Sequence, residues 1–166
     1  MQLKVGDMVV HPVYGIGHVV KIEEKQFSEI GALLYYCVTL PKSTVWIPVE
    51  AQATIGLRLV TAKSDLDYYR DLLKGRPVPL HEDCKQRHLE LASRLNQGSF
   101  QVMCEVVRDL TAWGWQKPLG RTDIVTLKKA EDSLYQEWAT ANGVSIAEAI
   151  EEVKSLLQPT QQASLA

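Results

Sequence analysis

Hydrophobic patterning along the chain changes character near residue 63. Before that point, short segments rich in valine, isoleucine, tyrosine and threonine are separated by glycine and proline, which is typical of strands joined by turns. The pattern predicts five short strands at residues 4–10, 17–27, 33–40, 44–49 and 57–61. Beyond residue 63 the apolar positions recur with helical spacing. We therefore expect a small all-β part followed by an all-α part.

Start and stop signals divide the second part into five helices. Ser64 and Ser99 can cap the first and third, and Ser145 with Glu148 forms a capping box for the fifth. The predicted helices end at Gly75, at residue 96, before Gly114, near Gly143 and before Pro159, and the second and fourth begin near residues 81 and 122. We predict domains at residues 1–62 and 63–158, followed by a flexible tail at residues 159–166.

The segment TVWIPV at residues 44–49 alternates clearly. Val45, Ile47 and Val49 share one face of a strand, so Trp46 points outward if these aliphatic residues face the core. Pro48 cannot donate a hydrogen bond to a neighbouring strand, which places the segment at a sheet edge. An edge strand with an outward tryptophan is suited to binding another protein. The alternative is that Trp46 covers the helical part.

Composition and charge limit the class of protein. The chain has 166 residues, of which 46% are hydrophobic, with 18 Lys and Arg against 20 Asp and Glu. This balance argues against a protein that coats nucleic acid by bulk positive charge, so a nucleic-acid contact must be local or delivered by a partner. There is no apolar run of the roughly 20 residues that a bilayer span needs, no secretory signal and no Cys-x-x-Cys pair. We expect a cytoplasmic protein without a membrane partner.

A local excess of positive charge lies early in the helical part. Residues 70–94 contain six basic side chains, which are Arg70, Lys74, Arg76, Lys85, Arg87 and Arg94. The same stretch contains only four acidic side chains, which are Asp71, Glu82, Asp83 and Glu90. This cluster is either a phosphate-facing patch or an ordinary solvated helix face.

Three residues in this stretch could in principle support other chemistry. His81, Cys84 and His88 are spaced i, i+3 and i+7, as zinc ligands or as a thiol and imidazole pair would be. The sequence offers no fourth ligand and no orienting third group, so a metal or thiol protein is the least favoured alternative. Cys84 also shares helical spacing with Leu80, Leu91 and Leu95, which would make it a small buried residue. We predict no catalytic residue, metal or cofactor.

Several motifs occur in one order along nearly the whole chain. In the first part they are VGD at residues 5–7, VVHP at 9–12, YGIG at 14–17, YY at 35–36, IPV at 47–49 and GLR at 56–58. In the second part they are RH at 87–88, Gly98, EVVRDL at 105–110 and Ala130. Together they resemble the CarD/CdnL family of bacterial transcription regulators. The first part alone also resembles the polymerase-interacting domain of transcription-repair coupling factors.

The resemblance implies a two-domain α+β fold, with a small Tudor/SH3-like β-barrel followed by a compact all-α domain of about five helices. It implies that the barrel binds the lobe of the RNA polymerase β subunit. The helical domain would touch promoter DNA at the upstream edge of the bubble and so stabilise the open complex. The polymerase-binding positions of the family fall on Lys25 and Trp46 here, beside Pro48 on the expected edge strand.

The same resemblance, with the basic residues of the next helix, gives a DNA-facing set. Its members are Cys84, Lys85, Arg87, His88, Arg121 and Lys128. Cys84 stands where family members have a tryptophan that wedges into the minor groove, and a thiol has no ring to support an unstacked base. We therefore expect a monomeric, non-enzymatic transcription regulator with weak DNA contacts made within the polymerase complex. The alternative is an interaction module that occupies the polymerase lobe without wedging DNA.

Overall fold

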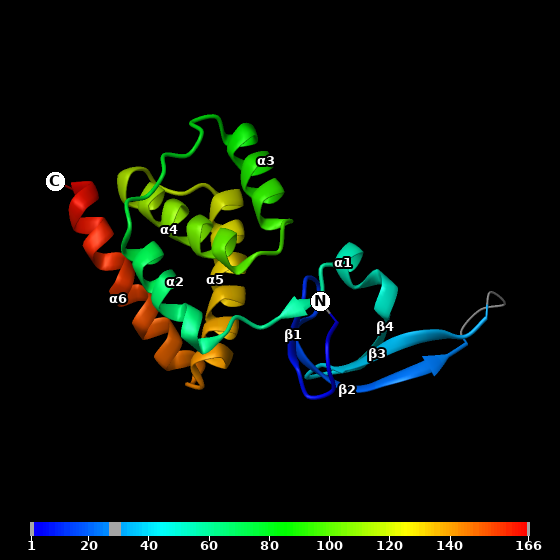
Figure 1. The fold of residues 1–166 in the computed structure, drawn as a ribbon. Helices are drawn as coiled ribbons and strands as arrows, with labels where there is room; N and C mark the ends of the chain where they lie inside the picture. Colours follow the sequence, from blue (N-terminus) through cyan, green and yellow to red (C-terminus); the bar gives the residue numbers. More distant parts are fainter. Residues whose placement is uncertain (1, 27–30, 166) are drawn as a thin grey trace. The chain divides into compact units, whose positions relative to one another are not determined.

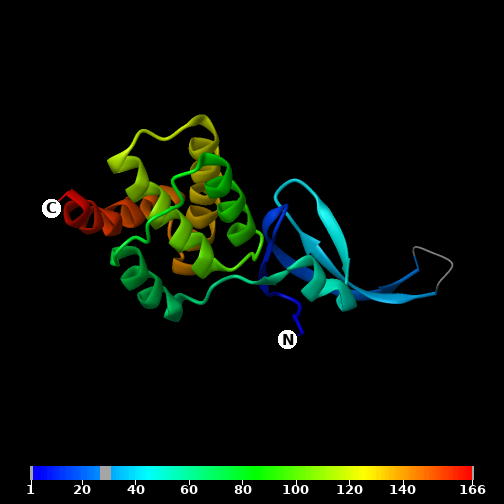
Figure 2. The same ribbon diagram turned by 90° about the horizontal axis from the view of Figure 1, so that it is seen from above.

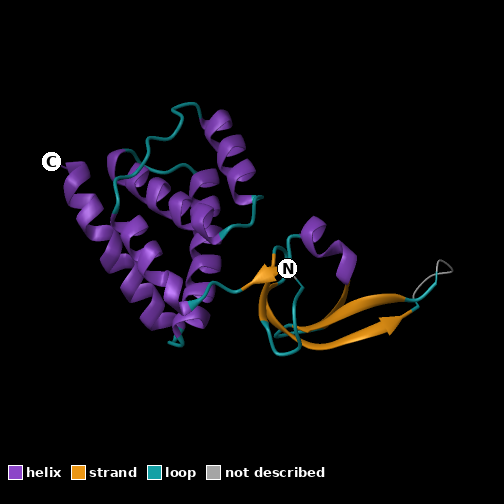
Figure 3. Ribbon diagram, in the orientation of Figure 1, coloured by secondary structure: helices purple, strands orange, loops and turns teal. Residues whose placement is uncertain are grey.

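The computed structural model describes residues 2–26 and 31–165 of the chain. The fold separates into two compact units, Met1–Val60 and Thr61–Ala166. Figure 1 follows the chain through both units, and Figure 3 shows that the strands lie in the first unit and the long helices in the second. The β unit and the helical unit each have their own hydrophobic core. The predicted α+β organisation is confirmed at this level.

The β unit contains one antiparallel sheet with the strand order β4-β3-β2-β1-β5. The strands are β1 (Met8–His11), β2 (Gly15–Lys25), β3 (Leu33–Thr39), β4 (Thr44–Pro48) and β5 (Arg58–Leu59). The expected Tudor/SH3-like barrel is not closed, because β4 and β5 form two separate edges of the described sheet. Between these strands the chain forms the 3-10 helix η1 (Val49–Ala51) and the short helix α1 (Gln52–Ile55), and β5 is only two residues long.

Strand β2 contains a bulge that changes which side chains face outward. Val19 pairs with Val38, but the next pair is Lys21 with Cys37, so Val20 is an extra residue. Before the bulge the odd-numbered Val19 is fully buried. After the bulge the odd-numbered positions take the outer face, and Ile22 packs against the inner core. Figure 2 shows the long β2–β3 hairpin from a second direction.

The inner face of the sheet forms a small apolar core around Tyr36. This side chain is fully buried with neighbours that include Leu3, Val38 and Ile47. Its hydroxyl accepts a hydrogen bond from the Leu3 backbone N–H at 3.2 Å and donates one to Gln52 Oε1 at 3.1 Å. The buried hydroxyl is therefore satisfied, and it links the start of the chain to the helical turn after β4.

The helical unit contains the five expected helices within the described residues. They are α2 (Leu66–Lys74), α3 (Cys84–Leu95), α4 (Phe100–Gln116), α5 (Arg121–Asn142) and α6 (Ile146–Leu165), preceded by the 3-10 helix η2 (Lys63–Asp65). The predicted starts at Ser99 and Ser145 are confirmed. Ser99 Oγ accepts a hydrogen bond from Val102 N at 3.0 Å, and Ser145 Oγ accepts one from Glu148 N at 3.1 Å.

Four helix boundaries differ from the sequence prediction. The N-cap of α2 is Asp65 and not Ser64, because Ser64 lies within the 3-10 helix η2. Helix α3 begins at Cys84 rather than near residue 81, because Asp83 is the N-cap and its carboxylate accepts a hydrogen bond from the Gln86 backbone N–H. Helix α4 continues through Gly114, where a side chain would approach Leu119 to 3.2 Å, so this glycine makes room for Leu119 instead of ending the helix. Helix α6 continues past Pro159 to Leu165, although proline removes one helical hydrogen bond. The flexibility of residues 159–166 stays a prediction.

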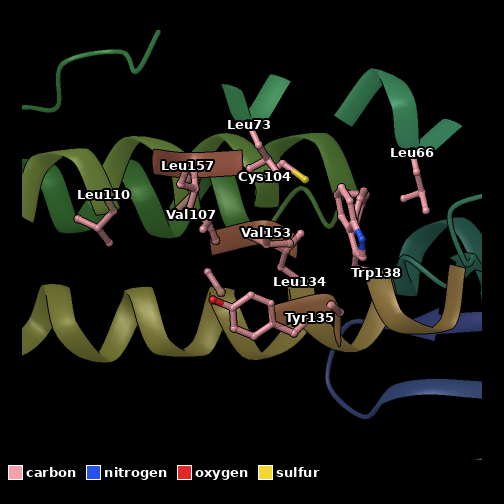
Figure 4. Packing of buried hydrophobic residues seen from close by; sticks show 14 of the residues in the cluster. Leu66, Leu73, Cys104, Val107, Leu110, Leu134, Tyr135, Trp138, Val153 and Leu157 are labelled. Atoms are coloured by element: carbon pink, nitrogen blue, oxygen red, sulfur yellow. The ribbon is translucent and has the colours of Figure 1, made fainter. Parts of the chain in front are cut away.

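The core of the helical unit gathers side chains from α2, α4, α5 and α6. Figure 4 shows Leu134 of α5 between Val107 of α4 and Trp138, with Val153 of α6 beside it. Trp138 is fully buried, and its indole Nε1 donates a hydrogen bond to Glu152 Oε1 at 2.7 Å. Among the helices in the described ranges, none has the length and apolar character required to cross a membrane. Leu91 of α3 also packs into this core.

Candidate functional site

The first candidate surface lies on edge strand β4 around Trp46. The indole is 39% exposed, and its Nε1 donates a hydrogen bond to Glu23 Oε1 at 3.2 Å. Lys25 Nζ lies 4.3 Å from the ring centroid, within the range of a cation-π contact. The predicted edge position and outward orientation of Trp46 are confirmed. We call Glu23, Lys25, Trp46 and Pro48 the Trp46 face.

The Trp46 face combines an aromatic ring with two opposite charges. Lys25 Nζ lies 3.5 Å from Glu23 Oε1, and both side chains are one-third exposed. The hydrogen bond from Trp46 lowers the pKa of Glu23 below its ordinary value, and the positive charge of Lys25 lowers it further. The ionised carboxylate thereby holds the edge of the indole while the ammonium group covers its face. The ring is oriented before any partner arrives.

Pro48 completes this surface at the end of β4. It is the partner of Tyr35 in the register of β3 and β4, while Trp46 is the partner of Cys37. Pro48 therefore shares the outer face with Trp46. The structure brings together the three residues expected to bind polymerase, which are Lys25, Trp46 and Pro48. Their binding role stays a prediction.

Sequence reasoning missed Glu23 as a member of this surface. Glu23 is 23 positions from Trp46 and lies on a strand that does not pair with β4. Their contact spans β3 and depends on the bulge at Val20, which turns Glu23 outward. Simple alternation along β2 could not reveal it, because the bulge breaks the alternation.

The second candidate surface is formed by the exposed side chains at and beyond the starts of α3 and α5. Cys84 is the first residue of α3 and is exposed, so its interpretation as a buried residue is wrong. Lys85 and His88 are also exposed on α3. Arg121 is the exposed first residue of α5, and Lys128 is exposed seven positions later on the same helix face. We call these five residues the helix-start surface.

Arg87 does not belong to the helix-start surface. Its side chain is only 8% exposed and pairs with Asp123, with Nη2 at 2.7 Å from Oδ2 and Nε at 3.2 Å from Oδ1. Its Nη1 donates to the carbonyl oxygens of His81 at 2.9 Å and Glu82 at 3.1 Å. Our inclusion of Arg87 among the DNA-facing residues is therefore corrected, because its charge is neutralised inside the protein.

The buried Arg87 positions the start of α3. The guanidinium carbon lies 5.3 Å from the centroid of the Trp113 ring in α4. Hydrogen bonds with Asp123 raise the pKa of Arg87, against the opposing effect of burial. Because one side chain contacts α4, α5 and the segment before α3, it fixes the first turn that carries Cys84.

Two residues of the motif EVVRDL, Arg108 and Asp109, hold the segment between α2 and α3 from within the helical unit. Asp109 is 1% exposed, and its Oδ1 accepts hydrogen bonds from Val78 N at 3.0 Å and Arg108 Nε at 2.9 Å. Arg108 Nη1 in turn donates to the Leu72 carbonyl at 3.2 Å. The segment between α2 and α3 is thus attached to α4 at Val78, and Arg87 attaches it again at His81 and Glu82. These motif residues have a structural role.

Three of the six basic side chains at residues 70–94 pair with acidic side chains. Arg70 pairs with Glu152 at 2.9 Å and with Asp67 at 2.8 Å. Arg94 lies 3.4 Å from Asp109. Together with the burial of Arg87, these pairs argue against one continuous phosphate-facing patch over residues 70–94. Lys74, Arg76 and Lys85 are exposed within this stretch.

Exposed aliphatic residues accompany the helix-start surface and were missed from the sequence. Leu89 of α3 is 63% exposed, and Ile124 and Val125 of α5 are 53% and 62% exposed. Ile124 and Val125 lie between Arg121 and Lys128 on α5. Adjacent residues on a helix point in different directions, so Ile124 and Val125 do not share one face of α5. Their adjacency was the sequence signal for an exposed apolar residue. The surface therefore combines positive charge with apolar contact area.

The metal alternative gains no support from the geometry. Within residues 2–26 and 31–165, no group of three or more His, Cys, Asp and Glu side chains could hold a metal ion. His81 Nδ1 instead accepts a hydrogen bond from the Asp83 backbone N–H at 3.0 Å. His81, Cys84 and His88 are therefore not gathered into a ligand set.

Comparisons with known proteins cover both units. Residues 3–60 match the model of the CarD-like/TRCF RID domain, and residues 70–154 match that of the CarD C-terminal domain. The chain is also similar to a Bacillus subtilis (strain 168) protein described as "Putative transcription factor YdeB". The two are 27% identical over 143 residues, which cover 86% of this chain and 94% of that relative.

Proposed function

This chain belongs to the CarD-like family of transcription regulators, and we propose that it binds the lobe of the bacterial RNA polymerase β subunit through its β unit. We propose further that the helical unit contacts promoter DNA and stabilises the open complex. The observation that carries the proposal is the ordered Trp46 face on an edge strand of the unit that matches the CarD-like/TRCF RID domain.

The chemistry of the Trp46 face suits a protein partner. Tryptophan supplies a large apolar contact area, and contact sites of this kind often owe most of their affinity to a few aromatic anchors. The hydrogen bond to Glu23 and the contact with Lys25 orient the ring in advance. Preorganisation reduces the entropy lost when the partner binds. The edge of β4 also offers backbone groups to a strand of the partner.

The helix-start surface suits a weak contact with DNA delivered by polymerase. Lys85, Arg121 and Lys128 are exposed and can approach phosphates. The formal net charge of the chain is -2, which is too acidic for strong independent DNA binding. A protein held on polymerase has a high effective concentration at the promoter, so weak contacts are sufficient. Contacts made only with melted DNA would slow bubble collapse.

The lifetime of the open complex tests this proposal. Polymerase and promoter DNA are incubated with and without the full chain, and dissociation is followed after a competitor is added. We expect the protein to lengthen the lifetime, and binding to the isolated β lobe is measured in parallel. An unchanged lifetime at saturating protein would contradict the DNA part of the proposal. A lack of binding to the lobe would contradict the polymerase part.

Charge reversal separates the two units. Lys85→Glu, Arg121→Glu and Lys128→Glu, made together, should shorten the open-complex lifetime while leaving affinity for the β lobe unchanged. Lys154→Glu, at an exposed lysine of α6, changes the net charge as much as each single reversal and is the matched control for Lys85→Glu alone. Equal effects of Lys85→Glu and Lys154→Glu would show that net charge is responsible instead of the helix-start surface.

A second candidate function is favoured by Cys84. This residue is exposed at the family's wedge position but has no ring to support an unstacked base. In this alternative the protein occupies the polymerase lobe without stabilising the bubble, and it competes with a tryptophan-bearing relative. Lobe binding without a change in lifetime would favour this function.

A further inference from the structure

Two consecutive backbone N–H groups are bound to different units of the chain. The N–H of Val60 donates a hydrogen bond to the Met8 carbonyl of β1 at 3.0 Å. The N–H of Thr61 donates to Oε2 of Glu137 in α5 at 3.0 Å. Val60 is the last residue of the β unit, and Thr61 is the first of the helical unit. No unattached residue therefore separates these two attachment points.

Glu137 holds Thr61 in two ways. Besides the backbone bond, Thr61 Oγ1 donates to the same Oε2 at 2.7 Å. Glu137 is 1% exposed and lies among the core residues of α5. A buried carboxylate is costly unless it is well hydrogen-bonded, and the two bonds from Thr61 help to satisfy the carboxylate of Glu137.

We propose that Glu137 is a latch that confines movement between the units to the backbone torsions beside the Val60–Thr61 peptide bond. With the latch closed, the connection contributes no flexible residue. With the latch open, Thr61 and Ala62 can leave the helical unit as far as the start of η2 at Lys63. Glu137 is a positioning residue in this scheme, because it acts through the linker and not by touching a partner.

The latch itself does not depend on the proposed function, but its expected effect on the open complex rests on it. If the β unit is held on polymerase, the helical unit searches for DNA at an effective concentration set by the length and stiffness of the linker. A closed latch narrows that search and reduces the ordering required when DNA is contacted. Opening the latch should shorten the open-complex lifetime without changing affinity for the polymerase lobe.

The test uses the full chain and measures the latch directly. Glu137→Leu removes the acceptor, whereas Glu137→Gln retains a side-chain carbonyl that can accept both bonds. Hydrogen exchange of the Thr61 amide should be at least tenfold faster in Glu137→Leu than in the parent protein, and Glu137→Gln should restore its protection. Core amides in α4 and thermal melts report whether the helical unit remains folded.

A second variant avoids the buried site. Insertion of Gly-Ser-Gly-Ser between Val60 and Thr61 leaves Glu137 and Thr61 intact but adds slack. The distance between one spin label on β3 and another on α6 should become more broadly distributed in this variant and in Glu137→Leu than in the parent. Equal widths in the parent and the insertion variant would overturn the inference, as would an unprotected Thr61 amide in the parent.

The two proposals fail in distinguishable ways. The exchange and distance measurements need no polymerase, so they test the latch alone. If the latch opens as expected and the variant still lengthens the open-complex lifetime as much as the parent, the consequence drawn for DNA contact is wrong and the latch stands. If the parent itself does not lengthen the lifetime, the proposed DNA function is wrong and the latch again stands. If Thr61 exchange is unaffected by Glu137→Leu in a folded chain, the latch is wrong whatever the protein does on polymerase.

Discussion

Arg87 and Asp123 form a two-point ion pair that joins the first turns of α3 and α5, with atoms 2.7 and 3.2 Å apart. Both side chains are buried, at 8% and 2% exposure. The pair places the exposed Cys84 and Arg121 at the starts of two helices that are tied together. The helix-start surface therefore depends on a buried interaction that is not itself part of it.

Removing one partner of this ion pair should destabilise the helical unit. Arg87→Met leaves Asp123 buried without its counter-charge, and the expected loss is about 3 kcal/mol in the free energy of unfolding. Urea unfolding, followed by a signal from the helical unit, measures the change. The double variant Arg87→Met with Asp123→Leu should recover part of this loss. A single variant within about 0.5 kcal/mol of the parent, the range of ordinary surface changes, would contradict the structural role.

Truncation of Trp46 should weaken binding to polymerase. Trp46→Ala is expected to cost about 2 kcal/mol in binding free energy to the β lobe, or roughly 30-fold in Kd, because it removes the aromatic anchor. Circular dichroism checks that the β unit stays folded. Val13→Ala, at a valine that is 78% exposed in the turn between β1 and β2, is the control. Unchanged affinity in folded Trp46→Ala would remove the Trp46 face from the binding surface.

The hydrogen bond between Trp46 and Glu23 predicts a pH effect. Because this bond lowers the pKa of Glu23, the ionised carboxylate favours the folded arrangement. That contribution is present above the ordinary pKa of glutamate and is lost as the pH falls through the lowered value. Trp46→Phe should raise the pKa of Glu23, as measured by NMR of its carboxyl carbon. Lys25→Met should raise it less, and the reverse order would show that the lysine charge dominates.

Restoring an aromatic ring at Cys84 should increase open-complex stability. Cys84 is exposed, so Cys84→Trp is expected to change folding stability by less than about 0.5 kcal/mol. Stacking on an unpaired base, less the cost of ordering the ring, should contribute about 1 kcal/mol and lengthen the lifetime a few-fold. Cys84→Ser is the control. A folded Cys84→Trp protein with no gain in lifetime would leave the interaction module as the better function.

Local sequence signals predicted much of the fold. The alternation in TVWIPV placed Trp46 outward on an edge strand, and the caps at Ser99 and Ser145 marked two helix starts. These features depend on residues that are adjacent or one helical turn apart. The closed barrel was not correct, because it depends on pairing between β4 and β5, which are separated by helical turns.

The errors at the candidate site have two physical origins, which are a long-range ion pair and the position of a helix start. Arg87 lies 36 positions from Asp123, so nothing near it in the sequence indicated a buried partner. Cys84 shares helical spacing with Leu91, but the helix begins at Cys84, and only Leu91 of the two packs into the core. Long-range pairing decides which charges remain at the surface, and local patterns do not record it.

The extra residue at Val20 decides which side chains of β2 belong to the Trp46 face. It does so through the length of the strand and not through the type of side chain. Strict alternation from Val19 would have turned Glu23 and Lys25 toward the core. Deletion of Val20 would exchange every later side chain of β2 between the two faces, which no single substitution does. An alignment of relatives across β2 therefore compares equivalent outward positions only when it keeps the extra residue at Val20 in place. The outer surface carries its aromatic and charged contacts because the strand is one residue longer than its partner requires.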